Sequence, residues 1–501
     1  MKYHCHRRTL PRLLTSFLIV GLFPVFLVET VSAQESKPGK AKNIIVFIGD
    51  GMGFNSDLAG TYYRYGEAGK QSYHSFPVFM GCTTFSRAKK DEPIPADCKG
   101  YDPEVFWISP HYGNQGTEFT RTTDSAAAST ALFSGIKTTS GKIGMSPHDE
   151  PIELISEIAV KLGKKAGSVT TVPLSHATPA GFSTHEPSRG NMDKIFLQMT
   201  APNSHLSVVM GGGNPLFSAG NPIKVKENES EKERTRRFLA VGGEETWKKL
   251  ETGSYNGFTV LRSRKQLEEL AAGKSVPDKV IGLPYESNYL SPSDGWLEDV
   301  PETKERLDDS YKKRNWDEIP SLATMTMGAI NVLSKDNDKG FVLMVEGGAI
   351  DGANHGQNVL RNSFEHTGFS KAIDATLAWI EKNSSWDETL VIITSDHETG
   401  QCFGPDTYSD DNENGVFDEG DTFNEFTPLE NNGRGKAPEA QYAGKSHSNA
   451  LVPLWAKGPG ATLFLQRVKG TDAKAGKFWN FSGKYVDNTD VFHVMKTVLA
   501  P

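Results

Sequence analysis

The sequence has little cysteine, no excess of positive charge and, beyond residue 33, no apolar run long enough to cross a bilayer. Its net charge of −8 argues against non-specific binding to nucleic acid. A membrane span needs about 20 apolar residues, so none is expected after the N-terminal segment. No internal repeat is found in the 501 residues. With 37% hydrophobic and 23% charged residues, the composition is that of a globular protein with a sizeable core.

Residues 1–33 have the pattern of a secretory signal peptide. Basic residues up to Arg12 precede an apolar stretch at residues 13–28, and Val31, Ser32 and Ala33 offer a cleavage site before Gln34. An uncleaved membrane anchor is the alternative, although the stretch is shorter than the ~20 residues a span needs. Because residues 1–33 carry four basic and one acidic side chains, their removal would bring the net charge from −8 to −11. We expect a secreted or periplasmic protein without a stable membrane span after cleavage.

Three cysteines remain after such cleavage, namely Cys82, Cys98 and Cys402. In an oxidising compartment, Cys82 and Cys98 could close a small loop, which would leave Cys402 unpaired. Three free thiols are the alternative, because pairing cannot be deduced from sequence.

Three apolar runs stop at residue types that ligate metals. Residues 43–49 end before Asp50, residues 341–345 before Glu346, and residues 391–395 before Asp396 and His397. Short runs rich in Val, Ile and Phe predict buried parallel strands. In open α/β sheets, ligands bind beyond the carboxyl ends of such strands. The three ends therefore predict a metal site assembled from distant segments.

The remaining patterns alternate between helix and strand. Helices are predicted at residues 125–133, 153–162, 323–333 and 362–383, and strands at 168–172 and 206–210. This rhythm predicts an α/β fold with a large, mostly parallel central sheet and helices on both faces. We expect residues 34–501 to form one domain. Residues 203–320, rich in Gly, Pro and charge, are expected to be an irregular insertion over the sheet that contributes one or two strands.

Asp351 and His355 are four residues apart, just after the predicted strand at 341–345. On a helical turn this spacing places both side chains on one face, which suits a single metal ion; a surface Asp–His pair is the alternative. Zinc takes His nitrogens together with Asp oxygens, whereas magnesium takes oxygen ligands. His355 and His397 therefore fit zinc, and Glu346 with a hydroxyl such as that of Thr178 fits magnesium.

Ser125 follows Asp124 at the start of an Ala-rich predicted helix. A Ser in this place is usually an N-cap. The same place exposes a hydroxyl where helix amides attract anions, which suits a nucleophile that attacks phosphate. No Gly-x-Ser-x-Gly motif surrounds Ser125, so a triad with a His base is not expected, and activation by a metal is the more coherent option.

Five dispersed segments occur in the order found in one family, and from residue 43 to its end the chain resembles the alkaline phosphatases. The segments are 50–53 (DGMG), 123–127 (TDSAA), 177–180 (ATPA), 345–355 (VEGGAIDGANH) and 396–397 (DH). The resemblance implies an alkaline-phosphatase-like fold, two zinc ions and one magnesium ion. It also implies hydrolysis of small-molecule phosphate monoesters to alcohol and inorganic phosphate through a phosphoserine intermediate. Relatives are commonly homodimers.

The resemblance further implies roles for individual residues. The first zinc ion would be held by Asp351, His355 and His447. The second would be held by Asp50, Asp396 and His397, with Ser125 bound to it as the nucleophile. Magnesium would be held by Asp50, Thr178 and Glu346. Arg189 would clamp the phosphate, and Asp124 would orient Arg189.

Two positions depart from the best-known members of that family. His176 stands where the enterobacterial form has Asp, and an imidazole there would bind magnesium more weakly than a carboxylate. Gly352 follows Asp351 where many members carry Lys, His or Trp, so the site lacks a side chain near the phosphate.

Residues 410–421 follow the calcium-loop pattern, with Gly415 at position 6. The candidate calcium ligands are Asp410, Asn412, Asn414, Val416 and Asp421. An acidic, solvated turn is the alternative. Bound calcium would stiffen the segment that carries His447.

Two other functions fit parts of the pattern. A phosphodiesterase of the same superfamily would share the two zinc sites, but it would lack the magnesium set of Thr178 and Glu346 and would often use Thr as nucleophile. A non-catalytic, metal-dependent phosphate-binding protein would need the same ligands but no nucleophile at Ser125.

Overall fold

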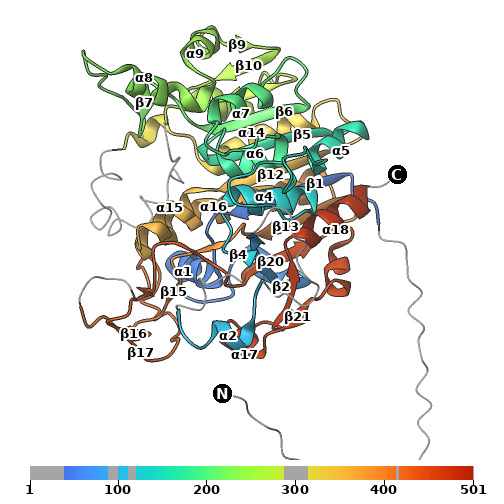
Figure 1. Ribbon diagram of the computed structural model, residues 1–501. Helices are drawn as coiled ribbons and strands as arrows, with labels where there is room; N and C mark the ends of the chain where they lie inside the picture. Colours follow the sequence, from blue (N-terminus) through green and yellow to red (C-terminus); the bar gives the residue numbers. More distant parts are fainter. Residues whose placement is uncertain (1–38, 89–99, 111–119, 287–313, 413–416, 500–501) are drawn as a thin grey trace, which may run out of the picture. The chain divides into compact units, whose positions relative to one another are not determined.

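Strand β1 (Asn43–Gly49) forms at the apolar run where a strand was expected, and it lies near the middle of a large sheet. The computed structural model describes residues 39–88, 100–110, 120–286, 314–412 and 417–499 (Figure 1). Within these residues the sheet has twelve strands, in the order β21-β22-β2-β20-β13-β1-β12-β5-β6-β11-β10-β9. The predicted signal peptide, residues 1–33, lies outside the described residues.

The middle of the sheet is parallel, as predicted. Strand β1 pairs in parallel with β12 (Phe341–Gly347) and β13 (Thr389–Thr394), and β12 pairs in parallel with β5 (Lys165–Pro173). Antiparallel pairs occur where β20 (Val452–Lys457) joins β13 to β2 (Val78–Thr83). Beyond β2 lie β22 (Lys484–Asp487) and β21 (Gly470–Thr471).

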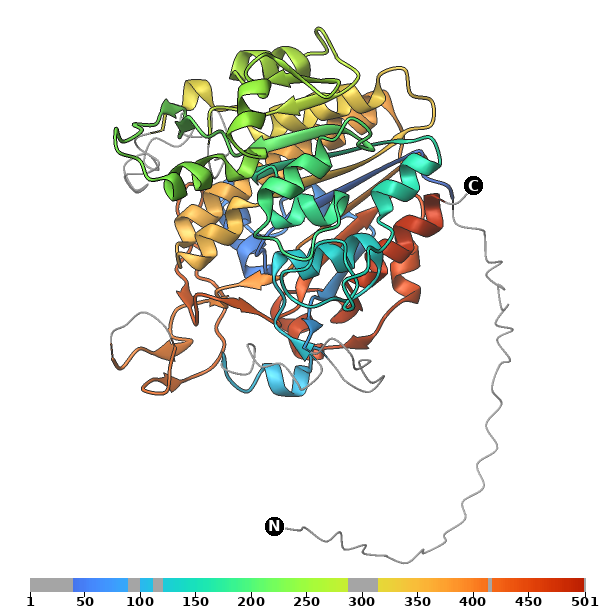
Figure 2. The same ribbon diagram turned by 45° about the horizontal axis from the view of Figure 1, so that its top comes forward.

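Helices cover both faces of the sheet. Side chains of a strand point alternately to its two sides, so a strand of apolar residues presents an apolar surface on each face. Ile44, Val46 and Ile48 pack into one apolar cluster, whereas Ile45 and Phe47 pack into another. The first cluster includes residues of α4 (Ser125–Ser134), α5 (Ile155–Lys161), α6 (Ala177–Ser183), α7 (Met192–Met199) and α18 (Thr489–Leu499). The second includes residues of α10 (Arg264–Ala271), α14 (Leu322–Ser334), α15 (Ala349–His355) and α16 (Val359–Asn383). In Figure 2 the teal helices of the first set lie in front of the strands.

The segment at 203–320 differs from its prediction. Instead of one or two strands it adds four to the edge of the sheet beyond β5, namely β6 (Leu206–Gly212), β11 (Val280–Gly282), β10 (Phe258–Leu261) and β9 (Ser254–Tyr255). Figure 1 shows β6, β9 and β10 in green with α8 (Glu231–Phe238) and α9 (Glu244–Leu250). Three of the four strands have only two to four residues. Runs this short carry too little alternation to be recognised from sequence.

Two of the cysteines are described. Cys82 and Cys402 are both buried free thiols, so the expected bond between Cys82 and Cys98 gains no support from the structure. Cys98 itself lies outside the described residues. Among the described helices, none combines the length and apolar character required to span a membrane.

Candidate metal centre

The carboxyl ends of β1, β12 and β13 bring acidic side chains to one edge of the sheet. In the parallel register, Ile48 of β1 stands opposite Glu346 of β12 and Thr394 of β13. Asp50 follows β1, and Asp396 follows β13 by two residues. Glu346 lies inside β12 rather than after it, because the strand runs on to Gly347. The three carboxylates are fully buried, so the structure brings the three strand ends together inside the protein.

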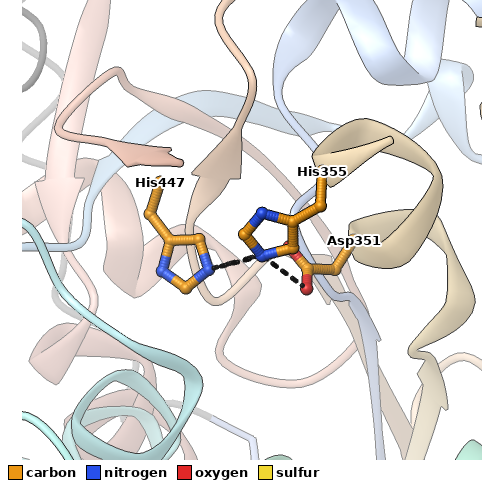
Figure 3. A group of neighbouring side chains, drawn as sticks. All are labelled: Asp351, His355 and His447. Atoms are coloured by element: carbon orange, nitrogen blue, oxygen red, sulfur yellow. Dashed lines mark hydrogen bonds and ion pairs between the residues drawn. The ribbon is translucent and has the colours of Figure 1, made fainter. Parts of the chain in front are cut away.

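Asp351, His355 and His447 form a first group of potential ligands (Figure 3). Helix α15 places Asp351 and His355 on one face, and their Oδ2 and Nε2 atoms are 3.2 Å apart. His447, on β19 (His447–Ser448), brings its Nε2 to 3.2 Å from Nε2 of His355. The two Nδ1 atoms lie 2.5 Å from the carbonyl oxygen of Lys445 and 2.8 Å from that of Thr123, respectively. A carbonyl only accepts, so each Nδ1 carries a proton, and the two Nε2 atoms, which lie 3.2 Å apart, are the ones available to a shared cation.

His397 is the centre of a second group. Its Nε2 lies 3.2 Å from Oδ2 of Asp396, 3.6 Å from Oδ1 of Asp50 and 3.2 Å from Oγ of Ser125. Its ring stacks on that of His447 with centroids 3.6 Å apart, so the two groups adjoin. All the side chains of this second group are buried, whereas that of His447 in the first group is only partly buried.

Two carboxylates belong to more than one group. Asp351 belongs to the first group, and its ligand atoms also lie within 4.8 Å of those of Asp50 and His397. The ligand atoms of Asp50 also lie within 4.8 Å of those of His176 and Glu346. Three cation positions can therefore adjoin one another, and Asp50 faces two of them.

The third group has oxygen donors and an imidazole that is already engaged. Glu346 accepts a hydrogen bond from Thr170 through one oxygen, and Thr178 lies at the start of α6. The Nη2 of Arg189 lies 3.2 Å from Nε2 of His176. Arginine can only donate, so His176 accepts through Nε2 and its lone pair is used by Arg189. Burial lowers the pKa of His176 to about 3, which keeps the ring neutral.

Several oxygens of these groups are buried without a hydrogen-bond partner. In the described part of the chain, this is true of both carboxylate oxygens of Asp50, Oδ2 of Asp396, Oε1 of Glu346 and Oγ1 of Thr178. Burial raises the pKa of Asp396 and of Glu346 to about 7 and moves the pKa of Asp50 well above its ordinary range. Unpaired buried carboxylates cost several kcal/mol each, and bound cations would remove this cost. The residues present therefore fit a set of divalent ions.

Ser125 is the first residue of α4, and Asp124, not Ser125, is the N-cap. The Oδ1 of Asp124 accepts from the amide of Ala127 at 3.1 Å, and Oδ2 accepts from Nη1 of Arg189 at 3.0 Å. The hydroxyl of Ser125 is thus not used for capping and stays beside His397. A cleft with about 590 Å³ of space is lined by Ser125, Arg189 and the first metal group, together with Thr122, Thr123 and Ser446.

Comparisons with known proteins identify the family. The alkaline phosphatase family model matches residues 41–500. The chain belongs to the alkaline phosphatase family. It is 31% identical to alkaline phosphatase 3 of Bacillus subtilis over 74% of this chain and 65% of that protein. It is 29% identical to the alkaline phosphatase of Escherichia coli over 76% of this chain and 75% of that one. The solved alkaline phosphatase of the Antarctic bacterium TAB5 superposes with a TM-score of 0.56 at 23% identity, covering 92% of this chain and 98% of that chain.

The chain thus spans about two thirds of the length of the first of these alkaline phosphatases. The central sheet described above agrees with this family, and the fold class expected from the sequence is confirmed.

Sequence reasoning missed residues that contact the candidate ligands and the backbone beside them. Thr399 and Asn354 are of common residue types, and only their positions beside predicted ligands distinguish them. Thr399 contacts Asp351, and Asn354 donates to the carbonyl of Gly51 at 3.0 Å. Their proximity to His397 and His355 is the signal that could have been used.

The candidate calcium loop closes a hairpin rather than joining two helices. Strands β16 (Tyr408–Ser409) and β17 (Thr422–Phe423) pair in antiparallel fashion on either side of it. Asp410, Asn412 and Asp421 are described, whereas Asn414 and Val416 lie outside the described residues. The carboxylate of Asp421 accepts from the amides of Asp411 and Asp418, both at 2.9 Å. Calcium binding stays a prediction.

Proposed function

We propose that the protein hydrolyses phosphate monoesters to an alcohol and inorganic phosphate through a phosphoserine at Ser125. One observation carries the proposal: Oγ of Ser125 lies 3.2 Å from Nε2 of His397 and opens into the cleft that also contains Arg189, Asp351 and His355. A hydroxyl at a helix N-terminus, next to an arginine and a set of metal ligands, suits attack on an anionic phosphate. Membership of the alkaline phosphatase family supports the same reaction.

We assign two zinc ions to the groups that contain histidine, because imidazole and carboxylate are zinc ligands. The first group is Asp351, His355 and His447, and the second is Asp50, Asp396 and His397 with Ser125. We assign magnesium to Asp50, Thr178 and Glu346, which offer oxygen donors. When bound, the ions would favour ionisation of the serine hydroxyl and neutralise charge on the attacking and leaving oxygens.

The chain's own residues bind and orient the substrate. Arg189 is held on two sides, by Asp124 at 3.0 Å and by His176 at 3.2 Å, so its guanidinium is fixed before substrate arrives. A fixed guanidinium can donate in a fork to two non-bridging phosphate oxygens. Oγ of Ser125 then attacks phosphorus, the bond to the leaving oxygen breaks, and the alcohol departs. Water hydrolyses the phosphoserine, releases phosphate and restores Ser125.

The test is Ser125→Ala, with Ser129→Ala as the matched control. Ser129 lies one turn further along α4. Its Oγ lies 3.2 Å from the backbone carbonyl oxygen of Ala126 and 3.3 Å from that of Ala177. With an aryl phosphate monoester, Ser125→Ala is expected to lower kcat by about three orders of magnitude or more, and Ser129→Ala to change it little. An acid-quenched reaction of the wild type should contain phosphoserine at residue 125 by mass spectrometry. Full turnover by Ser125→Ala, or a wild type that cleaves aryl diesters faster than monoesters, would refute the proposal.

From the sequence we also predict a secreted or periplasmic location after removal of residues 1–33, a homodimeric assembly, and zinc and magnesium as the bound metals. Metal analysis of the purified protein and its sedimentation would check the last two.

A further inference from the structure

Thr399 lies between ligands of the two proposed zinc groups. It is a buried residue of the short strand β14 (Glu398–Thr399), two positions after His397. Its Oγ1 is 2.7 Å from Oδ1 of Asp351 and 3.3 Å from Nδ1 of His397. Its backbone pairs in antiparallel register with His447. One small side chain thus contacts a ligand of each group.

We propose that Thr399 is a positioning residue, whose hydroxyl fixes His397 and Asp351 in the orientations that bind metal. The inference rests on the proposed function, because it takes these two side chains to be ligands.

The direction of the two hydrogen bonds follows from the groups involved. An ionised carboxylate only accepts, so the hydroxyl proton of Thr399 goes to Asp351. The hydroxyl oxygen is then free to accept the proton on Nδ1 of His397. With that proton on Nδ1, Nε2 keeps its lone pair, and Nε2 is the atom that faces Ser125, Asp50 and Asp396. Thr399 therefore selects the tautomer of His397 that can ligate.

The backbone at Gly51 packs closely on the side chains of Thr399 and Asp351. A Cβ added to Gly51 would lie 2.8 Å from Oδ1 of Asp351 and 2.9 Å from Oγ1 of Thr399, closer than real contacts allow. Gly51 also has a φ of +69°, which favours glycine. The backbone next to Asp50 is thus packed directly on the pair formed by Thr399 and Asp351.

The other two imidazoles are held differently. Nδ1 of His355 and Nδ1 of His447 are oriented by backbone carbonyls, at 2.5 and 2.8 Å, which substitution cannot remove. Thr399 supplies the corresponding contact for His397 from a side chain. Mutation of a side chain that orients a metal-binding histidine typically lowers metal affinity or activity by about 10- to 100-fold.

Three variants test the inference in the zinc-loaded protein. Thr399→Val keeps the shape of the side chain and removes both hydrogen bonds, whereas Thr399→Ser keeps the hydroxyl. Thr376→Val is the control, because Thr376 is also buried and donates to the carbonyl of Ala372 at 2.9 Å, within α16. Zinc per chain is measured by mass spectrometry after dialysis against increasing chelator. Thr399→Val should release zinc at roughly 10- to 100-fold lower chelator concentration than wild type, and Thr399→Ser and Thr376→Val should resemble wild type.

Two further readouts separate positioning from general stability. The visible spectrum of the cobalt-substituted protein should change in Thr399→Val and not in Thr376→Val, because the ligand geometry changes. The metal-free form of Thr399→Val should unfold about as far below wild type as that of Thr376→Val, since both variants remove buried hydrogen bonds. Wild-type zinc retention and an unchanged cobalt spectrum in Thr399→Val would overturn the inference, as would a metal-free unfolding temperature far below that of Thr376→Val together with no recovery of zinc retention in Thr399→Ser. A wild type that binds no zinc and cleaves no phosphate monoester would instead overturn the proposed function, and this inference with it.

Discussion

Replacement of Asn354 by Ala should destabilise the protein where two segments that carry candidate metal ligands meet. Asn354 is buried in α15, beside His355. Its Nδ2 donates to the carbonyl of Gly51 at 3.0 Å and to Oγ of Ser56 at 2.8 Å, and its Oδ1 accepts from the hydroxyl of Tyr442 at 3.1 Å. Three hydrogen bonds of about 1 kcal/mol each, with buried partners left unpaired, predict a loss of about 3 kcal/mol in the free energy of unfolding.

Urea unfolding of the metal-free protein measures this loss without a contribution from bound ions. Asn383→Ala is the control, since Asn383 is exposed and donates to one backbone carbonyl at 3.2 Å; it should cost about 0.5 kcal/mol or less. In the metal-loaded protein, Asn354→Ala should also lower zinc retention, because the backbone after Asp50 loses its anchor to α15. A loss below about 1 kcal/mol in the metal-free form would refute the reasoning, because the three hydrogen bonds would then contribute no net stability.

Two other predictions concern phosphate binding and pH. Arg189→Lys should lower kcat/KM for an aryl phosphate by about 10- to 100-fold and weaken inhibition by inorganic phosphate, because lysine cannot offer the planar fork; inhibition constants equal to those of wild type would contradict it. Burial alone would raise the pKa of Glu157 above its ordinary value of 4.5. Hydrogen bonds from His185 and from the amide of Leu154 outweigh burial and lower this pKa to about 2. The pKa of His185, the partner of Glu157, is raised. The ion pair therefore stabilises the fold fully between about pH 4.5 and 6.5. This stabilisation is lost as the pH falls towards 2, where Glu157 is protonated, or rises through the pKa of His185, where the imidazole loses its charge. With the side chains 27% and 24% exposed, we expect Glu157→Gln to cost about 1–2 kcal/mol in the metal-free protein at pH 6, and less at pH 3; an equal cost at both pH values would contradict the assignment.

The parts of the fold predicted well are those in which local pattern and tertiary environment agree. The expected bounds of β1 match the observed ones, because this run of seven residues, five of them apolar, is buried on both faces. The ends of α14 and α16 were placed within three residues, since their apolar periodicity extends to their termini.

The sheet edge at 203–320 and the supports of the metal centre were not predicted. Strand β11 has three residues, and it becomes a strand because β6 and β10 flank it. Asn354 and Gly51 are 303 positions apart in the chain. Their contact exists only after the parallel strands have aligned, and no local pattern encodes it. The candidate ligands at the strand ends stood out because Asp, Glu and His are uncommon directly after a buried apolar run, whereas residues such as Thr399 and Asn354 are of types common everywhere.

Strand β20 has a consequence for the order in which the chain can be completed. In the described sheet it is the bridge between β13 and β2, so β2, near the N-terminus, reaches the central strands through a segment close to the C-terminus. Until β20 has been synthesised, β13 has an open edge that is available to strands of other chains. A polypeptide stopped before residue 452 would hold all the proposed metal ligands, yet it would leave the edge of β13 open to aggregation. We therefore expect β20 to protect the protein from aggregation by covering the edge of β13, although it contributes no candidate ligand itself.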